Sequence, residues 1–148
     1  EAQKEVLFTK IQNRLEDLEG KTIAIWGLSF KPNTDDIREA SSLVLIRRLL
    51  DAGARVRAHD PEAMTSAEEQ IGHSAVQFLT NSYEALAGSD ALAIMTEWKA
   101  FRSPDFVRIR EALKMPLIFD GRNLFEPSSV AASGIEYHAI GRPVVMPD

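Results

Sequence analysis

Residues 21–50 read KTIAIWGLSFKPNTDDIREASSLVLIRRLL and contain the three parts of one βα unit. The opening KTIAIW is rich in β-branched and aromatic residues, which is typical of a buried strand, and SSLVLIRRLL repeats apolar residues at helical spacing. Between them lie residues 27–41, GLSFKPNTDDIREAS. Connections of this kind usually take only a few residues, so a loop as long and as charged as this one indicates a ligand site.

Short apolar runs alternate with helical patterns along the rest of the chain. After residue 50 the predicted strands are ARVRAHD, AVQFL, DALAIMT, PLIFD and IEYHAIG, and the predicted helices are MTSAEEQIG, SYEALAG, SPDFVRIREALK and PSSVAASG. Strands separated by helices need crossover connections, and these build a parallel sheet with helices on both faces. Residues 21–148 are therefore predicted to form one doubly wound α/β domain with a Rossmann-like, mostly parallel sheet.

The first twenty residues, EAQKEVLFTKIQNRLEDLEG, predict a helix that ends at Gly20. Their apolar residues are spaced roughly like one helical face: Val6, Ile11, Leu15 and Leu18. The chain opens with Glu1 and without a capping residue, so we interpret this segment as the end of a longer helix. A trimmed N-terminus is the alternative interpretation.

The composition excludes several classes of function. The chain has 148 residues, of which 45% are hydrophobic, and this length suits a single domain with its own core. Its 22 acidic residues outnumber its 17 basic ones, so it lacks the electrostatic support of a nonspecific nucleic-acid binder or of a protein that binds anionic membranes. The absence of cysteine excludes disulfides, thiolate metal sites and cysteine nucleophiles within this chain.

The sequence predicts neither a membrane segment nor a metal site. No apolar run approaches the span of a bilayer and no secretory signal heads the chain, so a cytoplasmic protein is the simplest interpretation. His59, His73 and His138 lie far apart in the sequence and show no ligand spacing, so they are interpreted as ordinary histidines.

Polar residues follow three of the predicted strands. They are residues 31–38 after TIAIW, residues 97–98 after ALAIMT and residues 121–123 after LIFD, while Pro61 follows the end of ARVRAHD. Ligands of doubly wound folds bind beyond the carboxyl ends of the strands. The polar residues therefore occupy the place where this fold predicts a site.

The first loop has the chemistry of a phosphate site. Gly27 permits a tight exit from the strand, Lys31 supplies a mobile positive charge, and the helix that begins at Ser41 supplies unpaired N–H groups. The acids Asp35, Asp36 and Glu39 do not suit phosphate. We expect them to hold the loop in shape by capping backbone N–H groups or by pairing with Arg38.

Two well-known nucleotide motifs are not present in the loop. It lacks the G-x-G-x-x-G fingerprint of a dinucleotide site and the Gly-Lys-Ser/Thr ending of a P-loop. Asp60 imitates the acid that binds an NAD ribose, but without the glycines we interpret it as a cap for the turn at Pro61. The residues by themselves predict a nucleotide-like anion at the strand ends.

GLSFKPNTDDIREAS, followed in order by GARVRAHDP, TEW and FDGRNLF, resembles the C-terminal UDP-binding domain of the UDP-glucose/GDP-mannose dehydrogenase family. The resemblance extends from about Gly20 to Arg142. It implies that residues 21–148 bind a UDP-sugar. It also implies that residues 1–20 are the C-terminal part of the long helix that joins the two α/β domains of that family and supports its homodimer.

The family resemblance also implies an activity. Family members oxidise the C6 hydroxyl of a nucleotide sugar to a carboxylate in two NAD-dependent steps, through an aldehyde-level intermediate and a cysteine thioester. The NAD-binding fingerprint and the cysteine belong to the family's N-terminal domain. We therefore expect no catalytic residue in this chain and no activity from the chain alone.

The matched motifs imply a role for individual residues. Phe30 and Lys31 would contact the nucleotide sugar, and Arg122 would bind its diphosphate through forked donors. Arg38 would point towards NAD held by the N-terminal domain.

Other matched residues are given structural roles. We assign Thr34, Asp35 and Asp36 to the architecture of the loop, and Glu97 and Trp98 to packing at a strand end.

The chain departs from the family pattern at two places beside the site. Ala40 and Ser41 stand where a Ser-Pro pair is common, and His59 stands where tyrosine is common. UDP-glucose, UDP-N-acetyl sugars and GDP-mannose all fit the motifs. Two alternatives stay open: a stand-alone Rossmann-like module that senses a nucleotide without catalysis, and a structural domain in which Lys31 and Arg122 only stabilise an interface.

Overall fold

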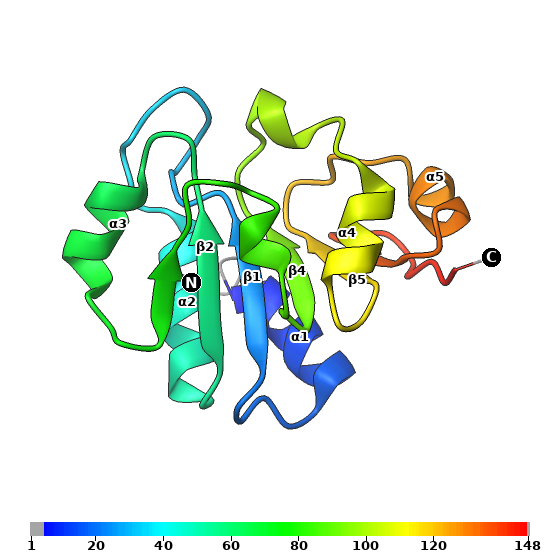
Figure 1. Ribbon diagram of the computed structural model, residues 1–148, viewed down its shortest axis with the longest axis horizontal. Coiled ribbons are helices and arrows are strands. Elements are labelled where there is room, and N and C mark those ends of the chain that lie inside the picture. Colours follow the sequence, from blue (N-terminus) through cyan, green and yellow to red (C-terminus); the bar gives the residue numbers. More distant parts are fainter. Residues whose placement is uncertain (1–4, 148) are drawn as a thin grey trace.

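Six strands form a parallel sheet at the centre of the computed structural model, which describes residues 5–147 (Figure 1). Their order across the sheet is β3-β2-β1-β4-β5-β6, and every neighbouring pair is parallel. The strands are β1 (Thr22–Trp26), β2 (Arg55–His59), β3 (Val76–Phe78), β4 (Ala91–Ile94), β5 (Leu117–Asp120) and β6 (Glu136–Ala139). This order confirms the predicted doubly wound, Rossmann-like sheet.

Helices cover both faces of the sheet. They are α1 (Val6–Leu15), α2 (Ser41–Asp51), α3 (Met64–Ile71), α4 (Phe106–Ala112) and α5 (Pro127–Ala132), with the 3₁₀ turns η2 (Glu84–Leu86) and η3 (Lys99–Phe101). Buried residues of α1, α2 and α3 share one hydrophobic cluster, and those of η2, η3, α4 and α5 share the other. Successive strand residues face opposite sides, so Ile25 enters the first cluster and Trp26 the second.

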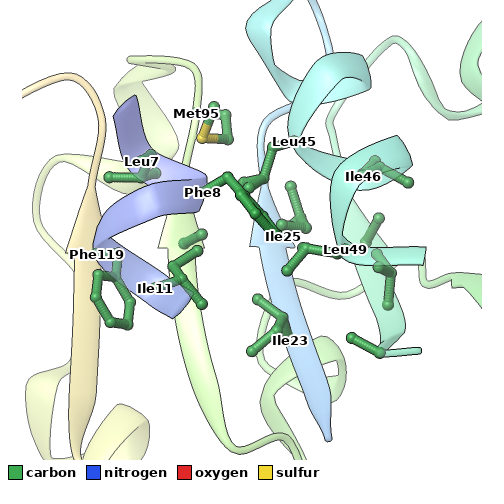
Figure 2. Close-up of a cluster of buried hydrophobic side chains, with 14 of the residues drawn as sticks. Leu7, Phe8, Ile11, Ile23, Ile25, Leu45, Ile46, Leu49, Met95 and Phe119 are labelled. Atoms are coloured by element: carbon green, nitrogen blue, oxygen red, sulfur yellow. The ribbon is translucent and has the colours of Figure 1, made fainter. Parts of the chain in front are cut away.

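The first helix is part of this core. Figure 2 shows Phe8 of α1 beside Leu45 and Ile25, with Leu7 and Ile11 on the side of Phe119. The three α1 side chains are all buried in the first cluster. Arg14, in the last turn of α1, pairs with Glu136 of β6 through an Nε–Oε2 distance of 2.7 Å. Packing and this ion pair therefore fix α1 against the sheet.

The end of α1 differs from the sequence-based expectation. The pattern predicts a helix to Gly20, whereas α1 ends at Leu15 because Glu16 takes a left-handed φ of 66°. The chain then turns, and Leu18 is buried in the core. Residues 1–4 of the predicted helix lie outside the described residues.

One other predicted helix is reduced to a single turn. The segment SYEALAG forms only η2, which places Leu86 in the core and ends before Gly88. Among residues 5–147, none of the helices is both long and apolar enough to cross a bilayer.

The carboxyl ends of the strands carry the loops that the sequence singles out. In Figure 1, β1 and β2 point upward and the light-blue loop after β1 arches above the sheet. We call this side the carboxyl edge and define it as residues 27–40, 60–63, 95–98 and 121–124. Strand order reverses between β1 and β4, and the crevice at such a reversal is the usual ligand position in open parallel sheets.

Candidate functional site

The loop after β1 begins with a close approach to the end of β4. Gly27 has a φ of 102°, and a Cβ added there would lie 2.5 Å from the backbone nitrogen of Thr96. Only glycine fits this combination of backbone conformation and space. The Thr96 hydroxyl donates to the Ser29 carbonyl at 2.7 Å, which binds the two strand ends together.

Asp60, at the end of β2, holds the base of the same loop. Its Oδ1 accepts hydrogen bonds from the backbone N–H groups of Glu62 and Ala63, each at 2.8 Å. This confirms the predicted turn cap. Its Oδ2 accepts from the Leu28 and Ser29 N–H groups, at 2.7 and 3.1 Å. The sequence did not predict these bonds across the sheet edge.

The outer part of the loop is held by its own polar groups. The Phe30 N–H donates to the Asp36 carbonyl at 2.8 Å, and the Asp36 N–H donates to the Thr34 hydroxyl oxygen at 3.1 Å. Asn33 and Glu39 take left-handed φ angles of 65° and 64°, which turn the chain back on itself. The Thr34 hydroxyl therefore has the predicted architectural role, and the Asp36 carboxylate has it too, because its Oδ1 accepts from the Arg38 N–H at 2.9 Å.

Phe30 and Lys31 lie on the exposed surface of the loop. The Phe30 side chain is 45% exposed. The Lys31 ammonium lies 5.8 Å from the centre of the Phe30 ring, within the range of a cation–π contact. An apolar ring beside a mobile cation can accept a base or ribose next to a phosphate.

Arg38 is exposed but is oriented by a neighbouring acid. Its side chain is 86% exposed. Its Nε and Nη2 lie 3.0 and 2.8 Å from the two Asp36 carboxylate oxygens. These hydrogen bonds lower the pKa of Asp36 to about 2. Phe30, Asp36, Arg38 and Glu39 line an open hollow of about 350 Å³.

The first turn of α2 is tucked beneath the loop. The Ser42 hydroxyl donates to the Leu28 carbonyl at 2.8 Å, and Ala40 and Ser42 are both buried. The N–H groups at the start of α2, which the sequence predicts as part of a phosphate site, therefore belong to a turn that is largely buried. A ligand would instead meet exposed side chains of this loop, which include Phe30, Lys31 and Arg38.

Arg122 comes from a second loop, which follows β5. Buried Asp120 accepts hydrogen bonds from the Arg122 N–H at 2.8 Å, the Leu124 N–H at 2.7 Å and the Tyr137 hydroxyl at 2.6 Å. Burial, together with the Asp120 carboxylate, raises the pKa of Tyr137 above its ordinary value. The backbone of Arg122 is thus fixed by interactions buried in the sheet.

The Arg122 side chain is paired with an acid that follows β4. Its Nε and Nη2 donate to Glu97 Oε1 and Oε2 at 3.1 and 2.9 Å. Partial burial opposes ionisation of this acid, but the hydrogen bonds and charge of Arg122 lower the pKa of Glu97 overall. The packing role predicted for Trp98 is confirmed by its position in the second core cluster, whereas Glu97 does more than pack.

The predicted site residues fall into two groups on the same edge of the sheet. Phe30, Lys31 and Arg38 share one loop, while Arg122 lies beyond β4, outside the hollow that Phe30 and Arg38 line. Hydrogen bonds through residues 96–98 of the intervening strand end connect the two groups. The arrangement offers cations and an aromatic ring for binding an anion.

The histidines lie in ordinary structural positions. His59 Nδ1 is 2.8 Å from the Leu79 carbonyl, His73 accepts from the Ala75 N–H, and His138 Nε2 lies 2.6 Å from Glu136. Within residues 5–147, no three His, Cys, Asp or Glu side chains are grouped to hold a metal ion.

Comparison with known proteins identifies relatives of the whole domain. Residues 24–127 match the UDP-glucose/GDP-mannose dehydrogenase family, UDP binding domain. The chain is 47% identical to a UDP-glucose 6-dehydrogenase of Pseudomonas aeruginosa over 146 residues, which is 95% of this chain and 32% of that protein. It is 43% identical to the UDP-glucose 6-dehydrogenase YwqF of Bacillus subtilis over 145 residues, which is 98% of this chain and 33% of that protein.

Solved structures show the same fold. A UDP-glucose dehydrogenase from Pyrobaculum islandicum aligns with a TM-score of 0.72 and 30% identity, over 83% of this chain and 27% of that chain. An NDP-N-acetyl-D-galactosaminuronic acid dehydrogenase from Methanosarcina mazei aligns with a TM-score of 0.76 and 28% identity, over 95% of this chain and 29% of that chain. The chain spans about a third of the length of the curated relatives it matches.

Proposed function

The chain belongs to the UDP-glucose/GDP-mannose dehydrogenase family as a UDP-binding domain, and from this premise we propose that it binds the nucleotide of a UDP-sugar at the carboxyl edge of its sheet. The observation that carries the proposal is the exposed pair Phe30 and Lys31 on a loop whose base is fixed by buried hydrogen bonds. Arg122 supplies a second cation from the same edge.

Each site residue has a distinct proposed role. The ring of Phe30 lies against the base or ribose, and Lys31 neutralises phosphate or contacts the sugar end. Arg122 binds the diphosphate, because a guanidinium offers forked donors that match phosphate oxygens. Binding energy from this nucleotide, which does not react, then positions the sugar for chemistry elsewhere.

The proposed reaction of the whole protein is an NAD-dependent oxidation of the sugar C6 hydroxyl of UDP-glucose or a related nucleotide sugar. The described residues do not form a dinucleotide site, since Asp60, at the position of a ribose-binding acid, is fully buried and hydrogen-bonded within the chain. Arg38, exposed and oriented by Asp36, fits a single contact to NAD held by an N-terminal domain. NAD would accept the hydride, and this chain would bind and orient the substrate.

The proposed setting is a cytoplasmic homodimer. In this arrangement α1 belongs to the segment that joins the N-terminal NAD-binding domain to residues 21–148. The packing of α1 and its ion pair with β6 support this role. A helix that is fixed to one domain constrains the orientation of a second domain joined to it. The acidic, cysteine-free composition is compatible with a reducing compartment.

Isothermal calorimetry of this chain with UDP, UDP-glucose, GDP and NAD⁺ tests the binding proposal. We expect UDP compounds to bind best, and Lys31→Ala and Arg122→Ala each to weaken UDP about tenfold or more, because each removes a hydrogen-bonding charge. Lys114→Ala is the matched control, since Lys114 is an exposed lysine before β5, at the opposite edge. Preference for NAD⁺ would favour a regulatory module instead, and affinity unchanged in both site variants would refute the site.

A further inference from the structure

We infer that Asp60 is a positioning residue for nucleotide binding, whose buried carboxylate sets the backbone from which Phe30 and Lys31 project. The inference rests on the proposed function of the loop and goes beyond it, because Asp60 itself is inaccessible to any ligand. Its exposed fraction is 0%.

The carboxylate of Asp60 is saturated by donors of its own chain. Besides the backbone bonds described above, Oδ2 accepts from the Ser29 hydroxyl at 3.3 Å and from the indole Nε1 of Trp98 at 3.0 Å. A carboxylate has about four lone-pair positions, and donors from three separate segments fill them here. No oxygen is left for a ribose hydroxyl, so Asp60 can influence a ligand only through the groups that it holds.

Ser29 links Asp60 to the site, because it is hydrogen-bonded to Asp60 and directly precedes Phe30. Its N–H and hydroxyl are bound to Asp60, its Oγ accepts from the Trp98 indole at 3.2 Å, and its carbonyl accepts from Thr96. All polar groups of the residue before Phe30 are therefore engaged. Ser29 is buried, whereas Phe30 and Lys31 are exposed. The backbone conformation at Ser29 therefore sets the direction in which these two side chains project into solvent.

The same carboxylate also touches the other half of the site. Trp98 follows Glu97, and Glu97 pairs with Arg122. Asp60 is thus bonded to both segments that flank the crevice between β1 and β4. A loop that is ordered before binding spares the ligand the cost of ordering it, and this is the physical basis of the expected effect.

The first test measures UDP affinity of Asp60→Asn in the 148-residue chain by calorimetry. The substitution keeps the shape but turns an N–H₂ group towards donors that need an acceptor. We expect the Kd for UDP to rise about tenfold or more, since one or more buried donors lose their partner. Asp90→Asn is the matched control: Asp90 Oδ2 accepts the Thr22 N–H at 2.8 Å at the opposite edge, and its loss should leave the Kd unchanged.

A double-mutant cycle separates positioning from general damage. If Asp60 acts through Phe30 and Lys31, then Asp60→Asn on a background with both Phe30→Ala and Lys31→Ala should weaken UDP by less than about threefold, because the groups being positioned are already gone. A full tenfold loss on that background would overturn the inference, and so would an unchanged Kd for Asp60→Asn alone.

Trp98→Phe covers the case in which Asp60→Asn fails to fold. It removes one donor to Asp60 and keeps an aromatic ring in the core, and we expect UDP to weaken about threefold. Unchanged affinity in this variant would also overturn the inference. If the unmodified chain does not bind UDP, the proposed function itself fails, whereas UDP binding that is insensitive to Asp60 and Trp98 refutes only the positioning role.

Discussion

The two loops that carry the candidate cations are anchored in the same way, each on a buried carboxylate, but their cations have different neighbours at the loop tips. The loop with Lys31 is anchored on buried Asp60, and the loop with Arg122 on buried Asp120. Each carboxylate accepts backbone N–H groups and one aromatic donor, the Trp98 indole in one case and the Tyr137 hydroxyl in the other. At the tips, Lys31 rests against Phe30, while Arg122 is held by Glu97.

The difference suits two tasks in binding one nucleotide. A lysine on an exposed turn can follow a phosphate or sugar as it moves, because its stem is flexible and its charge is compact. An arginine on a fixed backbone keeps its charge at one place on the sheet edge, where the Glu97 carboxylate competes with a phosphate for its donors. In both loops a buried carboxylate fixes the backbone geometry. We therefore expect substitutions at these anchors and substitutions at the loop tips to have separable effects.

The largest expected effect is at the base of the Arg122 loop. Asp120→Asn should lower the free energy of unfolding by about 2–3 kcal/mol, because the Tyr137 hydroxyl and two backbone N–H groups lose a charged acceptor. Tyr137→Phe, which removes one of these bonds, should cost less, about 1–2 kcal/mol. Urea denaturation measures both, and a loss under about 0.5 kcal/mol for Asp120→Asn would break the parallel with Asp60.

A smaller effect is expected at the tip of the same loop. Glu97→Gln should tighten UDP binding about threefold, since it frees the Nε and Nη2 of Arg122 and removes a negative charge near the diphosphate. Stability should change by less than about 1 kcal/mol, because the pair is partly exposed. Glu111→Gln, an exposed acid of α4, is the control. Weaker UDP binding in Glu97→Gln would mean instead that Glu97 presents Arg122 to the ligand.

The smallest effect is expected for the exposed pair of Asp36 and Arg38, and it depends on pH. The folded pKa of Asp36 is about 2, below its ordinary value of 3.8, so the unfolded chain binds the proton first. The stabilisation is therefore present above about pH 4 and is lost as the pH falls towards 2. Denaturation curves of Asp36→Asn and the unmodified chain should differ slightly at pH 5 and converge near pH 2. A difference that persists at low pH would show that the ionised pair is not its source.

The sequence was sufficient for the fold because its signals are local. Alternating apolar runs and helical patterns identified the strands, and strand-to-helix alternation fixed a parallel sheet. The errors were local as well: Glu16 takes a positive φ that its residue type does not predict, and SYEALAG forms a single 3₁₀ turn, although α5 shows that six residues can form an α-helix.

The site was only partly predictable. Asp36 and Arg38 are two residues apart, so their pairing could be anticipated. The bonds between Asp60 and Trp98 and between Arg122 and Glu97 join residues 38 and 25 positions apart, and they depend on which strands are neighbours. An acid closing a buried strand, as in HD and LIFD, is the signal that could have pointed to both anchors.

On the proposed function, UDP binds at the carboxyl edge, between the loops after β1 and β5. The most direct test of this site is an amide ¹⁵N–¹H NMR titration of the labelled chain with UDP. We expect saturable shifts concentrated in residues 28–38 and 121–124, with little change around Asp90 and Lys114 at the opposite edge. Saturable shifts confined to the opposite edge would contradict the proposed site.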